Sequence, residues 1–193
     1  MTRLEKAFEL FDAYNRQDPH KIIWEGVEYP AEYFYALQLY NWVIKLEPNA
    51  GETLLLASRS QHIGRWKIPR EQYPAGKSAY YKWRTDLAKF HAEIAGGLMW
   101  EAGYSPEETE AVQRIIRKEH IRTNPETQVM ENALCLVFLQ FQYDDFLKKH
   151  DDEKMIRIIQ RSWAKMSQPG KDAALTLAYN DKGKYLIEKA LGK

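Results

Sequence analysis

Apolar residues recur every three or four positions along most of the chain. In the stretch "TRLEKAFELFDAYN" they stand at Leu4, Ala7, Phe8, Leu10, Phe11 and Tyr14, which is the period of an amphipathic helix. The same spacing predicts helices over residues 29–48, 50–66, 79–103, 105–120, 124–150, 151–167 and 171–191. No segment alternates apolar and polar residues as a half-buried strand would. We therefore expect one all-α domain over residues 1–193.

Residues at the ends of these stretches support the helix boundaries. Ser105, Pro106 and Glu108 form the pattern of a capping box with proline in the first turn. Gly64 and Gly103 are expected to end helices, and residues 66–78, with two prolines and a glycine, are expected to form a loop. Residues 133–139 are apolar on every side, which predicts a buried central helix.

Composition narrows the class of protein. The mean hydropathy is -0.60, and no run of apolar residues approaches the length of a membrane span. The net charge of +1 gives no bulk indication of nucleic acid or membrane binding. The single Cys135 excludes a disulfide framework, and residues 1–19 lack the apolar core of a signal peptide. A cytoplasmic protein is the expectation.

Charge is unevenly distributed along the sequence. Residues 1–55 contain five Lys and Arg against nine Asp and Glu, whereas residues 59–89 contain eight against two. Such a basic centre is typical of a site for an anionic ligand, and ordinary surface charge on a long helix is the alternative. The expected partner is a phosphate-containing or other anionic small molecule.

Two short motifs are similar to those of class I aminoacyl-tRNA synthetases. "HIGR" at 62–65 differs in one residue from their HIGH signature, and "KMSQP" at 165–169 resembles their KMSKS loop. In those enzymes the HIGH segment follows the first strand of a parallel sheet. Here His62 follows a predicted helix, and no strand pattern surrounds it. We therefore expect that the chain is not a genuine synthetase.

Longer stretches carry a more specific resemblance. "QHIGRWKIPREQYP", "YYKWRTDLAKFHAE", "RKEH", "DDFLKKH" and "WAKMS" are similar to a family known as domain of unknown function number 4202, over nearly the whole chain. Members of that family are often labelled glutamyl-tRNA synthetase. The family name implies no reaction.

The order of helices and histidines also resembles the HD-domain phosphohydrolases. The resemblance implies an HD-like helix arrangement and a divalent metal held by His62 and His91, with an oxygen ligand from Glu93, Glu119 or Glu131. We select Glu131 as the third ligand. The sequence departs from the HD pattern because Tyr35, Ile63 and Asn132 stand where His, Asp and Asp are expected. The alternative is that both histidines are hydrogen-bonded core residues.

Basic residues around the histidines are the candidates for binding an anion. Arg84 and His91 are two turns apart on one predicted helix face, and Arg59 precedes His62 by about one turn. Arginine binds phosphate and carboxylate in bidentate fashion, which lysine does not. The substrate-binding candidates are Arg59, Arg65, Arg70, Arg84 and Lys165. Lys118 and Glu119 of "RKEH" are the catalytic candidates. Each arginine could instead form a structural ion pair.

Three classes of function follow from these patterns. The first is an anion-binding HD-like protein acting as a metal-dependent phosphohydrolase on a phosphorylated small molecule or nucleotide. The second is a metal-free binding or regulatory module with a basic pocket and no catalysis. The third, an HD-type di-iron oxygenase, needs more His and Asp ligands than the sequence supplies.

Overall fold

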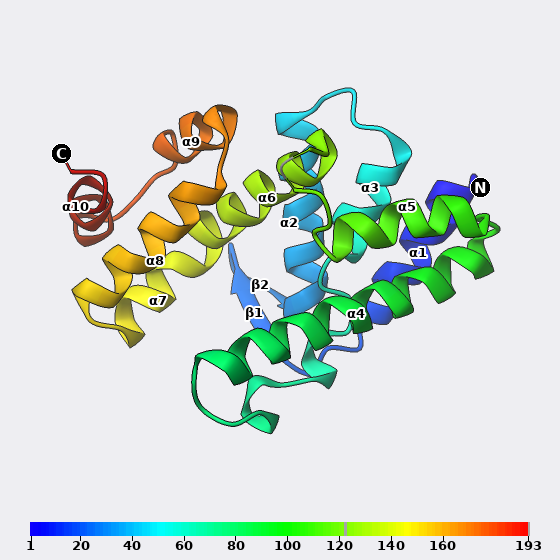
Figure 1. The fold of residues 1–193 in the computed structure, drawn as a ribbon, viewed down its shortest axis with the longest axis horizontal. Coiled ribbons are helices and arrows are strands. Elements are labelled where there is room, and N and C mark those ends of the chain that lie inside the picture. Colours follow the sequence, from blue (N-terminus) through cyan, green and yellow to red (C-terminus); the bar gives the residue numbers. More distant parts are fainter. Residues whose placement is uncertain (122, 193) are drawn as a thin grey trace. The chain divides into compact units, whose positions relative to one another are not determined.

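A computed structural model of the chain describes residues 1–121 and 123–192, and they form two compact units, Met1–Thr127 and Gln128–Lys193. The first unit contains five helices and a hairpin: α1 (Arg3–Asn15), β1 (Lys21–Trp24), β2 (Val27–Pro30), α2 (Ala31–Leu46), α3 (Glu52–Ser60), α4 (Lys77–Ala102) and α5 (Pro106–Ile116). Two short 3-10 turns, Arg65–Lys67 and Arg70–Gln72, interrupt the loop before α4. The predicted all-α class is confirmed (Figure 1).

The long helix α4 organises the first unit. It packs against α1 and α5, while α3 packs against α1, α2 and α5. The core between them is made of aliphatic and aromatic side chains that are almost completely buried, including Phe11, Phe34, Leu54, Leu56, Met99, Ile115 and Ile116. These residues lie on the apolar faces that the helical spacing predicts.

The β-hairpin was not predicted from the sequence. Strands β1 and β2 pair in antiparallel register from Lys21 with Pro30 to Trp24 with Val27. Glu25 and Gly26 form the turn, both with positive φ, at 51° and 79°, which fits the two-residue turns that match strand twist. Because each strand has only four residues, the stretch is too short to show a clear alternating pattern.

The predicted end of α4 and the predicted start of α5 are confirmed, whereas α3 ends at Ser60, before the predicted Gly64. Ser105 and Glu108 form the expected capping box at the start of α5, and Gly103 ends α4 in the left-handed conformation. Helix α5 nevertheless ends at Ile116, earlier than the predicted residue 120. The chain turns there because Lys118 and His120 adopt left-handed backbone angles, with φ of 59° and 56°.

Gly64 holds the turn that follows α3 in place. Its φ is 71°, and a Cβ at this position would lie 3.0 Å from ring atoms of Tyr14 and of Phe90. Both the left-handed backbone and the packed rings therefore disfavour any side chain here.

We expect Gly64→Ala to lower the free energy of unfolding by about 2 kcal/mol or more, since the left-handed backbone alone costs about 1–2 kcal/mol. Gly103→Ala is the matched control, because its φ is also positive, at 93°, but its Cβ would meet nothing within 4 Å. Urea unfolding compares the two variants. An equal loss of unfolding free energy in Gly64→Ala and Gly103→Ala would show that the rings of Tyr14 and Phe90 move aside without cost.

The second unit contains most of α6 (Pro125–Val137), a π-helical segment (Phe138–Gln142), α7 (Tyr143–Lys149), α8 (Asp152–Lys165), α9 (Gln168–Leu175) and α10 (Asp181–Ala190). Helix α8 packs on α7 and α10. The predicted buried segment is confirmed, since Ala133, Leu136 and Leu139 are at most 4% exposed. The predicted helix 124–150 is divided by the π-helical segment, and the predicted helix 171–191 is two helices.

Asn132 connects two elements of the second unit. Its Oδ1 accepts hydrogen bonds from Ser167 N at 2.9 Å and from Gln128 Nε2 at 3.1 Å, and its Nδ2 donates to Ser167 Oγ at 2.7 Å. A Cβ on Gly170 would lie only 2.7 Å from this amide. The "KMSQP" segment is therefore a tightly packed junction between α8 and α9.

The type of sheet and the hydropathy of the helices also bear on the class of fold. The described residues contain one two-stranded antiparallel sheet and no parallel sheet of the kind that carries a class I synthetase site. Within the same residues, no helix is long and apolar enough to cross a bilayer. A single domain over residues 1–193 and an HD-like arrangement of its helices stay predictions.

Candidate anion-binding site

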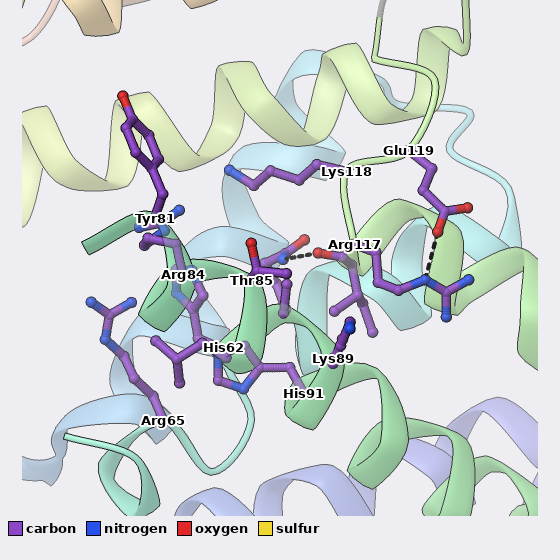
Figure 2. A pocket seen from close by; sticks show the side chains of 14 residues that line it. His62, Arg65, Tyr81, Arg84, Thr85, Lys89, His91, Arg117, Lys118 and Glu119 are labelled. Atoms are coloured by element: carbon purple, nitrogen blue, oxygen red, sulfur yellow. Dashed lines mark hydrogen bonds and ion pairs between the residues drawn. The ribbon is translucent and has the colours of Figure 1, made fainter. Parts of the chain in front are cut away.

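A cavity of about 370 Å³ lies in the first unit (Figure 2). Its walls come from three segments that are far apart in sequence: the turn after α3, the first half of α4 and the turn after α5. The lining residues are Gln61, His62, Arg65, Tyr81, Arg84, Thr85, Leu87, Ala88, Lys89, His91, Ile116, Arg117, Lys118 and Glu119. This volume is in the range of small-molecule binding sites.

Helix α4 forms the longest wall. Tyr81, Arg84, Ala88 and His91 follow one another at three- and four-residue steps and therefore share one face. Sequence spacing predicted this face, and the structure confirms that Arg84 and His91 line the same cavity. Arg84 is half-buried, whereas His91 is only 3% exposed, and Figure 2 shows both side chains on α4.

The turn after α3 presents Gln61 and His62. The His91 Nδ1 lies 2.7 Å from the backbone oxygen of Ile63, and the Gln61 Nε2 donates to the backbone oxygen of Ile116 at 2.9 Å. These two hydrogen bonds connect the turn to α4 and to the end of α5. The rings of His62 and His91 are consequently neighbours, with centroids 5.9 Å apart. The two histidines proposed as metal ligands therefore lie side by side, while their role as ligands stays a prediction.

The turn after α5 supplies the third wall. Lys118 reaches the cavity from a left-handed backbone position, a conformation that is costly for residues other than glycine. The Glu119 carboxylate accepts a hydrogen bond from Arg117 Nε at 2.7 Å, and Arg117 also contacts Glu110 at 2.9 Å. Glu119 is therefore held by an arginine in the same wall.

Positive charge dominates the lining. Five of its residues are cationic, Arg65, Arg84, Lys89, Arg117 and Lys118, and one, Glu119, is acidic. Arg65 has a distant partner, since its Nε lies 3.7 Å from Glu32 Oε1. Across residues 1–121 and 123–192, Arg84 and Lys89 have no ion pair or hydrogen bond through their side chains. The cavity therefore contains cations that protein carboxylates do not neutralise.

This environment keeps both histidines neutral. Burial lowers the pKa of His91 to about 4, and the charges of Arg65 and Arg84 act in the same direction. Burial also lowers the pKa of His62 well below its usual value, reinforced mainly by the charge of Arg65. Because a backbone carbonyl only accepts hydrogen bonds, His91 Nδ1 carries the proton and Nε2 is the acceptor nitrogen of the neutral ring.

The residues in the cavity do not fit a divalent metal well. Two neutral imidazoles are suitable ligands, but Glu119 is paired with Arg117, and the surrounding cations oppose a further positive charge. In the part of the chain that the structure describes, no group of three His, Cys, Asp or Glu residues has a metal-binding arrangement. The metal role of His62, His91 and Glu131 stays a prediction.

The other predicted site residues lie elsewhere. Arg59 forms a two-point ion pair with Asp12, at 2.7 and 2.8 Å, and does not line the cavity. Arg70 also lies outside the lining and donates to the backbone oxygens of Tyr73 and Pro74, both at 2.8 Å. Glu131 and Lys165 belong to the second unit, where their side chains are 3.7 Å apart.

Sequence reasoning missed several lining residues. Gln61, Tyr81, Thr85 and Arg117 were not selected as candidates. Tyr81 and Thr85 could have been found, because they lie within one turn of Arg84 on the face that carries His91. Gln61 and Arg117 adjoin His62 and Lys118, but their approach to the cavity depends on tight turns that no periodic pattern reveals.

The fold and the cavity define an all-α protein with a cationic pocket around two neutral histidines. The chain belongs to the family described as Domain of unknown function (DUF4202), whose model matches residues 5–187. No curated protein and no solved structure matches the chain.

Proposed function

We propose that the first unit binds a phosphate-bearing small molecule in the cavity between α3, α4 and α5. The observation that carries this proposal is Arg84, a guanidinium that lines the cavity and has no protein partner within the described residues. Guanidinium groups form charge-assisted, bidentate contacts with phosphate oxygens. Lys89, Lys118 and Arg65 add positive charge around the same space.

The cationic residues of the lining support an anionic ligand rather than a cationic one. His62 also lines the cavity, and as a neutral imidazole it has one N–H that can donate a hydrogen bond to a phosphate oxygen. The charge of the lining disfavours a metal-dependent phosphohydrolase relative to metal-free binding. Hydrolysis with Lys118 and Glu119 as catalytic groups stays a prediction.

Titration calorimetry with inorganic phosphate tests the proposal. We expect Arg84→Ala to weaken binding by about tenfold or more, since hydrogen bonds to charged groups contribute about 1.5–3 kcal/mol. Arg84→Lys keeps the charge but loses the planar fork, so it should also bind more weakly than the unmodified protein.

Lys82→Ala is the matched control for Arg84→Ala. Lys82 lies on the same helix, and its replacement by alanine removes the same charge. Lys82 does not line the cavity, and its Nζ lies 2.6 Å from an Asp86 carboxylate oxygen. Its loss should change phosphate affinity much less. Equal weakening in both variants would indicate only a general effect of net charge, and equal affinity in all proteins would remove Arg84 from the site.

A further inference from the structure

A buried carboxyl group lies next to Arg65, one of the cations of the cavity. Glu32 stands in the first turn of α2, and its side chain is only 12% exposed. Its Oε1 atom lies 3.7 Å from Arg65 Nε, whereas its Oε2 atom is buried and has no hydrogen-bond partner in the described part of the chain. Arg65 lines the cavity (Figure 2), and Glu32 does not. A negative charge on Glu32 therefore attracts this guanidinium from outside the cavity.

The surroundings of Glu32 do not stabilise its charged form. A buried carboxylate usually accepts hydrogen bonds through both oxygens, but Oε2 accepts none, and the contact with Arg65 is longer than a hydrogen bond. Burial raises the pKa of Glu32 to about 7, against the attraction of Arg65, and the negative charge of Asp18 also raises it. The group therefore changes its charge near neutral pH.

The charge of Arg65 also reaches the interior of the cavity. Burial lowers the pKa of His62 and of His91, and the charge of Arg65 acts in the same direction on both. A bound anion and an ionised Glu32 would therefore compete for one guanidinium, and their negative charges would repel each other. Protonation of Glu32 removes both obstacles to anion binding.

We infer that Glu32 is a positioning residue of the anion site: its carboxylate competes with the ligand for Arg65, and its neutral carboxyl group leaves Arg65 to the ligand. The cavity should consequently bind anions more tightly in mildly acidic solution. The inference rests on the proposed function, because it concerns the affinity of the same cavity.

Other ionisable groups near Glu32 must be separated from it. Asp18 Oδ2 accepts a hydrogen bond from Glu32 N at 2.9 Å, and His20 Nδ1 lies 2.9 Å from Asp18 Oδ1. His20 is 70% exposed, so its titration requires a control. His62 and His91 stay neutral near pH 7, because burial lowers the pKa of each. Exposed charges also lie on the neighbouring segments, at Arg16, Lys21 and Glu28.

Titration calorimetry with sulfate at pH 6 and pH 8 tests the inference. Sulfate keeps both charges over this range, whereas phosphate takes up a proton. If anion binding raises the pKa of Glu32 by about one unit, sulfate should bind about fivefold more tightly at pH 6 than at pH 8. Glu32→Gln has nearly the shape of the neutral carboxyl group. Its affinity should be equal at both pH values and match that of the unmodified protein at pH 6.

Glu28→Gln and His20→Asn are the matched controls. The first removes the same charge from an exposed position on β2, and the second removes the exposed histidine. Both should keep the fivefold pH dependence. Its loss in His20→Asn, or its persistence in Glu32→Gln, would overturn the role of Glu32.

The unmodified protein provides a test that needs no variant. Carbon-13 NMR of the Glu32 carboxyl group should show a higher pKa with sulfate bound than without it. An unchanged pKa, or equal sulfate affinity at pH 6 and pH 8, would overturn the inference while leaving the anion site intact. Failure to bind either sulfate or phosphate at both pH values would overturn the anion site itself.

Discussion

Replacing Arg59 by alanine is expected to lower the free energy of unfolding by about 3–5 kcal/mol, the cost of removing one partner from a buried ion pair. The Arg59 and Asp12 side chains are only 12% and 11% exposed, and two hydrogen bonds join them. Without the guanidinium, the Asp12 carboxylate would remain buried without its main compensating charge. Arg59 also contacts the rings of Phe8 and Tyr40, so packing is lost as well.

Urea unfolding of four variants checks this expectation: Arg59→Ala, Asp12→Ala, the double variant and Arg84→Ala. The double variant Asp12→Ala with Arg59→Ala should lose less than the sum of the two single variants, because no unpaired charge remains. Arg84→Ala is the matched control, and it should change stability by less than about 0.5 kcal/mol, since Arg84 has no partner among the described residues. Comparable losses in Arg59→Ala and Arg84→Ala would contradict the assignment of Arg59 to structure and Arg84 to ligand binding.

The pH dependence of stability should reveal the neutral state of His91. Its pKa in the folded protein is about 4, against 6.5 for a histidine exposed to water. The unfolded chain therefore takes up a proton first, and the contribution of His91 to stability is full above pH 6.5 and lost as pH falls towards 4. Between pH 7 and pH 5 this loss amounts to about 2 kcal/mol.

The titration of Glu32 should change the free energy of unfolding in the opposite direction between pH 5 and pH 7. Burial raises its pKa from 4.5 to about 7, against the attraction of Arg65. The folded protein favours the protonated carboxyl, so this contribution to stability is full below pH 4.5 and lost as pH rises through 7. Its loss between pH 5 and pH 7 is about 2 kcal/mol.

Denaturant unfolding of Glu32→Gln and His91→Gln at pH 5 and pH 7 separates the two contributions. The free energy of unfolding of Glu32→Gln, relative to that of the unmodified protein, should be about 2 kcal/mol higher at pH 7 than at pH 5. His91→Gln should show the reverse difference, because it removes the group that destabilises the fold in acid. A pH-independent difference for either variant would mean that its pKa is the same in the folded and unfolded chain.

Helix positions were largely predictable because each helix buries one face, and that face repeats every three to four residues. The capping box at Ser105 and the left-handed Gly103 fixed both ends of the α4–α5 connection. The β-hairpin was not predictable because each strand has only four residues, too few for an alternation of apolar and polar residues to be recognised. The π-helical segment Phe138–Gln142 leaves no signal in the spacing of its residues.

The site was predictable in part. Helical spacing placed Arg84 beside His91, and the juxtaposition of His62 with His91 followed from the resemblance to HD domains. Arg59 was grouped with Arg84 because both belong to the basic stretch of the sequence. The ion pair of Arg59 with Asp12 on α1 joins residues far apart in the chain, so the sequence does not reveal it. Distinguishing a paired arginine from an unpaired one requires the tertiary contacts.

The left-handed backbone at Lys118 has an evolutionary consequence. A chain selected only for stability would tend to replace this lysine by glycine or asparagine, which tolerate that conformation at lower cost. Lysine at this position therefore places a positive charge in the cavity lining at a cost in backbone energy. If the proposed anion site is correct, relatives that bind the same ligand are expected to keep a cationic residue at position 118, and glycine or asparagine is expected there where the site is not used.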